Sequence, residues 1–341
     1  MSNKVSIITP SYNRANIIHE TAESIFRQTY PNWEWIIVDD GSSDNSWEII
    51  KKYAACDSRV KVFKREREPK GACPCRNIAV EKSSGDFLIF LDTDDLLASF
   101  CIEQRVEAFL NNPEMDFIVF STLMFKNKPD DLKLLWNIDS EQDDIDRILI
   151  GDPICQGTGT IWKKSSFEKI GMWDERLYLW QDIQLHLRSL ISGLKYCKRM
   201  DLSPDVFIRI SDVSLSRTDF HSLPKLKSRY LVFEEVIIEL KKQEKIENHS
   251  VALKDMFISI FLNSLNVKSF DISNDLLNTS KKVQLFSKYE IQLLKFIILI
   301  YKVRLNKLNV LSYFSGRILK RFSFKGEVFL NKITYNQKIE L

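Results

Sequence analysis

The chain has 341 residues, of which 44% are hydrophobic and 28% are charged. This is the composition of an ordinary globular protein, and it excludes an intrinsically disordered chain. The longest uninterrupted apolar run, residues 296–301, is far shorter than the ~20 residues that a membrane-spanning helix needs. The six cysteines show no paired spacing, and the N-terminus has no charged-then-apolar leader. We therefore expect a cytoplasmic protein with reduced thiols.

The formal net charge of +3 is unevenly distributed along the chain. Residues 281–341 contain thirteen Lys or Arg and three Glu, so the first 280 residues carry a net charge of −7. A mildly acidic body and a basic tail predict two regions with different roles. We place the boundary after residue 222, where the strand signals end.

Predicted strands and helices alternate through the first part of the chain. The predicted strands are residues 4–10, 33–40, 60–64 and 86–91, and the predicted helices are residues 16–28, 45–55 and 75–83. This alternation predicts right-handed βαβ units and an α/β fold with a mainly parallel, Rossmann-like central sheet flanked by helices. Such sheets bind their ligands beyond the carboxyl ends of the strands.

Polar residues gather where three of these strands end. The first strand leads into Tyr12, the second into Asp39 and Asp40, and the fourth into the sequence Asp-Thr-Asp-Asp at residues 92–95. Because the carboxyl ends of parallel strands meet at one edge of a sheet, we expect an aromatic ring and five carboxylates to face the same site.

The acidic segment after the fourth strand predicts a cation site. Residues two apart in an extended segment point the same way, so Asp92 and Asp94 can share one ion. Crowded carboxylate oxygens suit Mg²⁺ or Mn²⁺ held between protein and phosphate. For Asp95, capping of a following helix is an equally good interpretation. Of Asp39 and Asp40, we expect one to bind turn amides and the other to accept from a base or a sugar.

Several common nucleotide and metal motifs are absent from the sequence. There is no G-x-G-x-x-G, no G-x-x-x-x-G-K-[ST] and no H-E-x-x-H, which disfavours a Rossmann dehydrogenase and a P-loop NTPase. Cys73 and Cys75 lack a second pair of ligands, so we predict no zinc site. The charge of a bound phosphate must then be met by a metal ion and by Arg or Lys.

Beyond residue 223 the sequence predicts helices only. Their expected ranges are residues 224–245, 251–265, 272–285, 287–305 and 310–322. Lys288, Gln292, Lys295 and Lys302 fall on one stripe of an otherwise apolar helix. Two interpretations remain: a bundle that packs on the preceding domain or on a second subunit, or a platform over residues 287–322 for an anionic membrane surface. No nucleic-acid motif is present, and we expect no nucleic-acid partner.

Four segments together resemble family 2 glycosyltransferases of the GT-A fold. They are SIITPSYNR, QTYPNWEWIIVDDGSSD, CRNIAVEKSSGDFLIFLDTDD and IGMWDERLYLWQD, and with their order and spacing the resemblance covers residues 4 to about 216. It implies a GT-A domain at residues 1–222, followed by a basic helical domain at residues 223–341. It also implies an inverting, metal-dependent glycosyltransferase that makes a bacterial surface polysaccharide. The donor would be a nucleoside-diphosphate sugar, with UDP favoured, and the acceptor a glycan or a lipid-linked glycan. The enzyme would be cytoplasmic, either free or peripheral on the inner face of the plasma membrane.

The resemblance assigns a donor pocket residue by residue. It implies that Pro10 and Tyr12 line the base pocket, with Tyr12 stacked on a uracil-like ring. Asp40 would accept a hydrogen bond from the base while Asp39 supports the turn. Arg76, in the C-R-N segment, would lie near the base and the phosphates.

The resemblance also assigns the metal site and the catalytic base. Asp92, Thr93 and Asp94 match the D-x-D motif, with Asp94 as the direct Mn²⁺ or Mg²⁺ ligand and Asp92 near the ribose or the metal. Asp95 would support these two carboxylates without binding the metal ion directly. Asp182 matches the general base, near the start of a helix. A carboxylate there is expected to stay ionised and to take the proton of the acceptor hydroxyl.

Residues near Asp182 are expected to face the acceptor. Gly157, in a Gln-Gly-Thr-Gly segment, would let a ligand approach the backbone, although an edge-strand kink explains it almost as well. Trp180 would offer an aromatic face, whereas Trp173 is as well explained as a core residue. Gln181 stands where the family usually has Glu, and it keeps the hydrogen bonding but loses the charge. We therefore expect the choice of acceptor to differ from that of the family, while Asp182 remains the base.

A second departure lies near residue 211. Ser211 stands where the family often has His, so a metal or phosphate contact is missing unless His221 or Asp212 replaces it. Arg209 either reaches the diphosphate or makes a surface salt bridge. These departures keep open a non-catalytic GT-A-like module that binds a nucleotide or a glycan. A nucleotidyltransferase would need a Gly- and Lys-rich phosphate loop, and the segment SYNR is not one.

Overall fold

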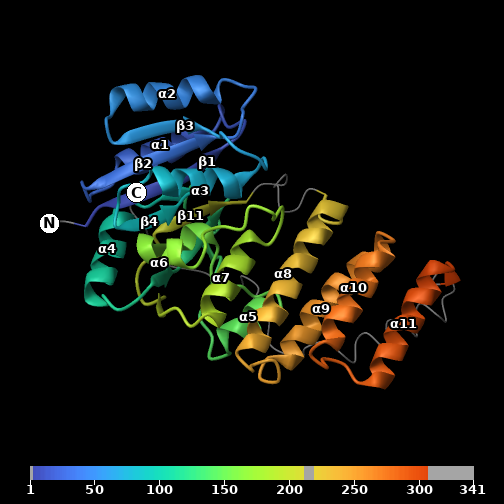
Figure 1. Cartoon of the computed structure of the whole chain (residues 1–341). Helices are drawn as coiled ribbons and strands as arrows, with labels where there is room; N and C mark the ends of the chain where they lie inside the picture. Colours follow the sequence, from blue (N-terminus) through green and yellow to red (C-terminus); the bar gives the residue numbers. More distant parts are fainter. Residues whose placement is uncertain (1–2, 211–218, 306–341) are drawn as a thin grey trace.

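A computed structural model describes residues 3–210 and 219–305 (Figure 1). Its central sheet has seven strands in the order β10-β6-β9-β4-β1-β2-β3. The strands are β1 (Val5–Ser11), β2 (Trp33–Asp39), β3 (Val60–Lys64), β4 (Phe87–Phe90), β6 (Phe117–Phe120), β9 (Thr160–Lys163) and β10 (Tyr196–Arg199). β1 runs parallel to β2 and β4, whereas β9 runs antiparallel to both of its neighbours. The mainly parallel sheet predicted from the sequence is confirmed, with one antiparallel strand in its middle.

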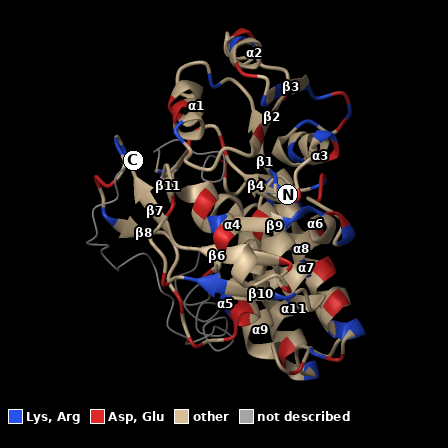
Figure 2. Ribbon diagram, turned by 90° about the vertical axis from the view of Figure 1, so that its left-hand side faces the viewer, with Lys and Arg blue, Asp and Glu red and all other residues tan. Residues whose placement is uncertain are grey.

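Helices cover both faces of this sheet. The helices of the α/β part are α1 (Ile18–Phe26), α2 (Ser46–Cys56), α3 (Ala72–Lys82), α4 (Cys101–Asn111), α5 (Asp144–Leu149), α6 (Lys164–Lys169) and α7 (Gln181–Ile191). Successive strand residues point to opposite faces, so Ile7 belongs to the buried cluster that includes α1, α2 and α4, whereas Ile8 belongs to the cluster that includes α3 and α7. The ribbon of β1, β4 and β6 is free of charged residues, as a strand buried on both faces requires (Figure 2).

A second, four-stranded sheet adjoins the acidic segment. It has the order β5-β11-β7-β8, formed by β5 (Leu96–Leu97), β7 (Thr122–Phe125), β8 (Leu134–Leu135) and β11 (Val206–Arg209). β5 begins directly after Asp95, and β11 pairs with it antiparallel. This pairing holds Arg209 beside the acidic segment. A single 3₁₀ turn, η1 (Gly157–Gly159), leads into β9.

The C-terminal helices form a row that leads away from the sheet (Figure 1). They are α8 (Leu223–Lys242), α9 (Ser250–Asn266), α10 (Phe270–Lys281) and α11 (Lys288–Lys302). α8 packs on α7, and α9 packs on α5. Phe233 and Phe257 belong to the same buried cluster as Ile8 and Phe90. The row of helices therefore packs on the α/β part through α8 and α9, as one of the two interpretations of the tail required.

The predicted helices of the tail can be compared with the structure one by one. The predicted helix at residues 310–322 lies outside the described residues. Among the helices that the structure describes, none has both the length and the hydropathy needed to cross a membrane. The predicted helix boundaries of α8 to α11 agree with the structure to within a few residues, and the largest difference is that α10 ends at Lys281 instead of residue 285.

Candidate functional site

The loops that follow β1 and β2 are tied to each other. The amide of Asn13 donates to Ser42 Oγ (2.9 Å), and Asn13 Oδ1 accepts from the amide of Ser43 (2.8 Å). Asp39 Oδ2 accepts from the amides of Gly41 (3.1 Å) and Ser42 (2.9 Å). Of the two acidic residues at the end of β2, Asp39 therefore supports the turn. This geometry fixes the loop on which Tyr12 lies.

Asp40 and Tyr12 lie at this edge of the sheet, each beside a cation that the sequence did not single out. The amide of Asp40 donates to the carbonyl of Ser11 (2.8 Å), and its buried carboxylate accepts from Arg65 Nε. Tyr12 is 42% exposed, and Lys70 Nζ lies 3.7 Å from the centroid of its ring. Arg65 and Lys70 come from the segment between β3 and α3. Pro10, the other predicted base-pocket residue, is partly buried within β1.

The acidic segment after β4 is anchored from α1. Thr21 Oγ1 lies 3.0 Å from the carbonyls of both Thr93 and Asp95. The side chains of Asp92 and Asp94 remain open to solvent, with 44% and 36% exposed. Thr93 is buried, so its side chain faces the protein and not the open side of the site.

Asp95 holds three parts of the chain together. Its buried carboxylate accepts from the amide of Arg209 (3.1 Å) and lies 3.2 Å from Thr158 Oγ1. It therefore links the acidic segment to β11 and η1. No α-helix follows directly, because residues 96–97 form β5, so the helix-capping interpretation of Asp95 was wrong.

The electrostatics of this segment favour a bound cation. Burial and the neighbouring charge of Asp92 raise the pKa of Asp94, while Arg14, 4.0 Å away, opposes the rise. Burial and the charges of Asp94 and Asp92 raise the pKa of Asp95 well above its usual range. Crowded carboxylates raise one another's pKa because like charges repel. Two exposed carboxylates on one segment fit Mg²⁺ or Mn²⁺, which bind one or two carboxylates and take further oxygens from phosphate.

Arg76 joins the acidic segment to the start of α7. Its Nη2 donates to Asp92 Oδ1 (2.6 Å), and its Nη1 donates to Gln181 Oε1 (3.0 Å). The guanidinium lies 4.8 Å from the ring centroid of Trp173. Arg76 is buried, and its Nε has no partner within the described chain. One arginine in the first turns of α3 thus connects two segments that are about 90 residues apart in sequence.

Asp182 lies in the first turn of α7. It is not the N-cap, because Trp180 occupies that position with a left-handed φ of 64°. Burial raises the pKa of Asp182; Arg76 and the backbone of Gly157 oppose this, and Asp92 adds to it. We expected the start of the helix to keep the carboxylate of Asp182 ionised. Burial instead has the larger effect on its pKa, and it raises that pKa. A raised pKa gives the carboxylate the greater proton affinity that a general base needs.

Gly157 packs directly behind Asp182. A Cβ at this position would lie 2.9 Å from Asp182 Oδ1 and 3.3 Å from Trp173 Cη2. Glycine is required here because the carboxylate and the indole leave no room for a side chain. The sequence suggested a backbone exposed to an acceptor; Gly157 is instead buried against the carboxylate of Asp182.

The other residues predicted near the acceptor have mixed positions. Gln181 uses its amide to accept from Arg76 and to donate to the carbonyl of Leu177 (3.0 Å), so it connects protein segments. Trp180 is half-buried. Trp173 is a core residue, because Asn77 binds both its amide and its carbonyl.

Arg209 lies against the acidic segment and already has protein partners. Its Nη2 donates to Glu20 Oε2 (2.6 Å), and its Nε donates to the carbonyl of Asp94 (3.2 Å). The pair of Arg209 with Glu20 is a salt bridge in the wall of the site, and it lies close to Asp94, the predicted metal ligand. His221, a possible replacement for the missing histidine, contacts Asn263 of α9. Ser211 and Asp212 lie outside the described residues.

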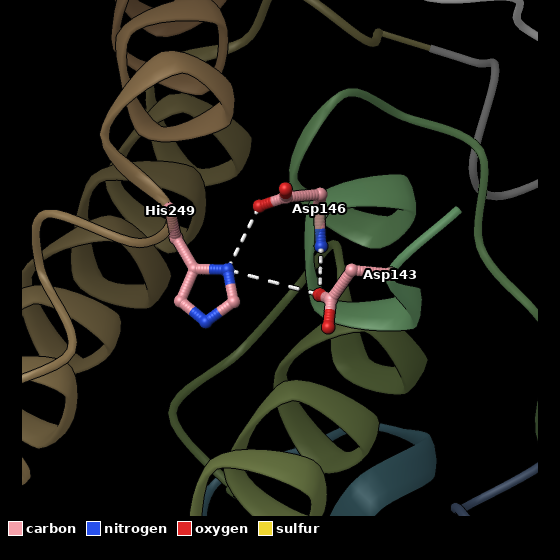
Figure 3. Close-up of side chains that lie close together, drawn as sticks. All are labelled: Asp143, Asp146 and His249. Carbon is pink, nitrogen blue, oxygen red and sulfur yellow. Dashed lines mark hydrogen bonds and ion pairs between the residues drawn. The ribbon is translucent and has the colours of Figure 1, made fainter.

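A second group of metal-ligating side chains lies between α5 and α9 (Figure 3). His249 Nδ1 is 2.8 Å from Asp146 Oδ1 and 3.7 Å from Asp143 Oδ1. Within the described chain, these are the only three His, Cys, Asp or Glu side chains whose ligand atoms all lie within 4.8 Å of one another. Asp143 also caps α5 by accepting from the amide of Asp146, so the group has an evident role in joining the two helices.

Comparisons with known proteins identify a family for the N-terminal part of the chain. Residues 6–171 match the model of Glycosyl transferase family 2. A putative teichuronic acid biosynthesis glycosyltransferase, TuaG of Bacillus subtilis, is 42% identical over 103 residues, covering 30% of this chain and 40% of TuaG. The Escherichia coli UDP-Glc:alpha-D-GlcNAc-diphosphoundecaprenol beta-1,3-glucosyltransferase WfgD is 41% identical over 108 residues, covering 32% of this chain and 42% of WfgD.

The fold is also found among solved structures. S. aureus TarS 1-349 in complex with UDP-GlcNAc superposes with a TM-score of 0.67 at 17% identity, covering 99% of this chain and 100% of that one. This likeness extends through the helical part and shows a shared GT-A-like fold. The chain matches only about two fifths of the length of the two curated relatives. Residues 6–171 thus have the sequence of a Glycosyl transferase family 2 domain, within a chain whose fold is GT-A-like.

Proposed function

We propose that this protein is an inverting, metal-dependent glycosyltransferase. It transfers a hexosyl or N-acetylhexosaminyl group from a nucleoside-diphosphate sugar, most readily a UDP-sugar, to a glycan or a lipid-linked glycan. The observation that carries this proposal is the position of Arg76, which contacts Asp92 of the D-x-D segment and Gln181 beside Asp182. These contacts support a donor phosphate group bound next to the proposed base, Asp182, at one edge of the sheet.

The proposed donor site uses four residues that surround the open side of this edge. Tyr12 offers its exposed ring to the base, and Asp40 offers the carboxylate oxygen that Arg65 does not engage. Lys70 must leave the face of Tyr12, or shift along it, when a base stacks there. Asp94 and Asp92 would hold the Mg²⁺ or Mn²⁺ ion, which would neutralise the charge that develops on the departing diphosphate.

The proposed reaction is a single displacement. The acceptor hydroxyl oxygen forms a bond to the anomeric carbon from the face opposite the diphosphate, and the bond from that carbon to the diphosphate oxygen breaks. Asp182 takes the hydroxyl proton as the new bond forms. Arg76 holds a positive charge beside both Asp92 and Asp182, and so attracts the diphosphate while it moderates the pKa of the base.

Two relatives support the choice of donor and acceptor. TarS was crystallised with UDP-GlcNAc, and the printed name of WfgD states a UDP-glucose donor and a diphosphoundecaprenol-linked acceptor. A lipid-linked acceptor would place this protein at a membrane surface.

The outer face of α11 has the chemistry that such a surface needs. Exposed apolar residues run along it beside a row of lysines with the same seven-residue spacing: Tyr289, Phe296 and, directly after the helix, Val303, beside Lys288, Lys295 and Lys302. An interfacial helix combines an apolar stripe with cations that meet anionic headgroups. We therefore propose peripheral binding to the inner face of the plasma membrane through α11. Flotation of the full chain with phosphatidylglycerol vesicles tests this. Phe296→Glu should reduce binding, and Leu110→Glu on α4 should not; equal binding of both variants would contradict it.

Asp182→Asn separates catalysis from binding. We expect this variant to bind UDP with Mn²⁺ as the wild type does and to lose transfer, measured as UDP release from the best-bound UDP-sugar with acceptor. Wild-type transfer would place the base elsewhere. If the wild-type protein itself binds UDP and releases none from any UDP-sugar, the alternative of a non-catalytic nucleotide- or glycan-binding module replaces the proposal.

A further inference from the structure

The segment between β3 and α3 lies against the proposed base site. Arg65 donates from Nε to the carboxylate of Asp40 and from Nη1 to the carbonyl of Arg67. Lys70 Nζ lies 3.7 Å from the ring centroid of Tyr12. Two cations of this segment therefore contact the two residues that are proposed to bind the base. The position of the segment helps to set the shape of the donor site.

Arg67, in the middle of this segment, contacts carboxylates from two different parts of the chain. Its Nη1 and Nη2 donate to the two carboxylate oxygens of Glu81 on α3 (3.0 and 2.9 Å). Its Nη2 also donates to Glu175 Oε1 (2.7 Å), and Glu175 lies in the loop between α6 and α7. The contact with Glu175 spans 108 residues of sequence and joins the donor-site segment to the loop that leads to Asp182.

Glu175 is bound from the protein interior as well. The same oxygen, Oε1, accepts from Nδ2 of the buried Asn77 (2.9 Å). Asn77 also fixes the backbone of Trp173, because its Nδ2 donates to the carbonyl (2.9 Å) and its Oδ1 accepts from the amide (3.0 Å). The ring of Trp173 packs against Gly157, directly behind Asp182. A continuous set of contacts therefore runs from the donor-site segment, through one carboxylate oxygen, to the surroundings of the proposed base.

Stability is a weak explanation for the pair of Arg67 with Glu175. The side chain of Arg67 is 38% exposed and that of Glu175 is 23% exposed. Ion pairs this exposed contribute little to the free energy of unfolding, because water screens their charges and two long side chains lose rotamer freedom. The pair does fix the loop before α7 relative to the donor-site segment, and this is a contribution that catalysis can use.

We propose that Glu175 is a positioning residue for glycosyl transfer. This step rests on the glycosyltransferase function proposed above. By engaging Arg67 and Asn77 with one oxygen, Glu175 sets the distance between the donor site and the loop that carries Trp173. It thereby sets the place of Asp182 relative to the anomeric carbon. The base, the acceptor hydroxyl and that carbon must be aligned for transfer, so a small displacement of the loop lowers kcat without weakening donor binding.

Glu175→Gln tests the charge of this residue alone. The glutamine keeps an oxygen for Asn77 and loses the charge that pairs with Arg67. We expect kcat to fall about tenfold, while the affinity for UDP with Mn²⁺ and the KM for the donor stay at the wild-type values. The matched control is Glu81→Gln, which removes the other carboxylate from the same arginine on the donor side only, and its kcat should be that of the wild type.

The assay is UDP release from the best-bound UDP-sugar with acceptor, with urea unfolding measured on the same preparations. Arg67→Met removes the pair from its other end. Its loss of kcat should equal that of Glu175→Gln, and the double variant should lose no more than either single variant, because all three break one interaction.

Four results would overturn the inference alone: a wild-type kcat in Glu175→Gln, an equal loss in Glu81→Gln, additive losses in the double variant, or a loss that follows lowered stability in urea. A change confined to KM would overturn it too. If the wild-type protein neither binds UDP nor releases UDP from any UDP-sugar, the proposed function is refuted and this inference falls with it.

Discussion

Replacing Gly157 with alanine tests whether the position of Asp182 matters for catalysis. The new methyl group would lie 2.9 Å from Asp182 Oδ1 and 3.3 Å from Trp173 Cη2. Comfortable non-bonded contacts begin near ~3.5 Å, so the carboxylate must move by about half an ångström. Gly157 does not have a left-handed φ, so alanine itself is not strained there.

The expected effects on catalysis and on stability differ. A misplacement of ~1 Å in a catalytic geometry can cost ~100-fold in rate, so half that displacement should lower kcat roughly tenfold. Overpacking usually costs ~1–3 kcal/mol. The atom displaced here is the end of an aspartate side chain, so we expect a cost of about 1 kcal/mol in the free energy of unfolding. Affinity for UDP with Mn²⁺ should not change.

The assay is UDP release from the best-bound UDP-sugar, with UDP affinity and urea unfolding measured on the same preparations. Gly159→Ala is the matched control, because its methyl group would lie 3.2 Å from Thr122 Cγ2 and away from Asp182. A wild-type kcat for Gly157→Ala would refute the reasoning, and so would an equal loss in Gly159→Ala.

Three further predictions concern other parts of the account. Asp94→Asn should abolish the dependence of UDP binding on Mn²⁺, and calorimetry with and without EDTA would show an unchanged dependence if the metal lies elsewhere. Burial lowers the pKa of His186 from 6.5 to about 4, so stability should fall by about 3 kcal/mol as the pH drops from 6.5 to 4. His186→Phe should remove this loss of stability between pH 6.5 and 4, as measured by urea unfolding at a series of pH values. An unaltered pH profile of stability would show that His186 does not cause the loss. Arg105→Leu should destabilise the fold by ~3–5 kcal/mol, because it leaves buried Asp205 unpaired; a loss below about 1 kcal/mol in urea unfolding would contradict this.

The sequence was a good guide wherever local pattern decides structure. The alternation of strands and helices predicted the sheet, because a buried parallel strand leaves a continuous apolar run such as residues 87–91. The exposed pair Asp92 and Asp94 and the position of Asp182 at the start of α7 followed from the same elements and from the family resemblance. The roles of these residues remain predictions.

Contacts between distant segments could not be foreseen. Asp40 pairs with Arg65, Arg209 pairs with Glu20, and Lys70 lies over the ring of Tyr12. These contacts exist because the fold brings segments that are distant in sequence to the same edge of the sheet. β9 carries no signal that it runs antiparallel between β4 and β6, since period and composition do not encode direction. The contacts proposed to position the loop before α7 likewise join segments that are distant in sequence.

Calorimetric titration of UDP, with Mn²⁺ and with EDTA, tests the central claim most directly, with GDP, ADP and CDP run in parallel. The site at Tyr12, Asp40, Arg76, Asp92 and Asp94 predicts that UDP binds most tightly and that EDTA abolishes its binding. Tighter binding of another nucleotide would keep a donor site and contradict the uridine assignment. Binding of none of the four, with or without the metal, would contradict a nucleotide-sugar donor altogether.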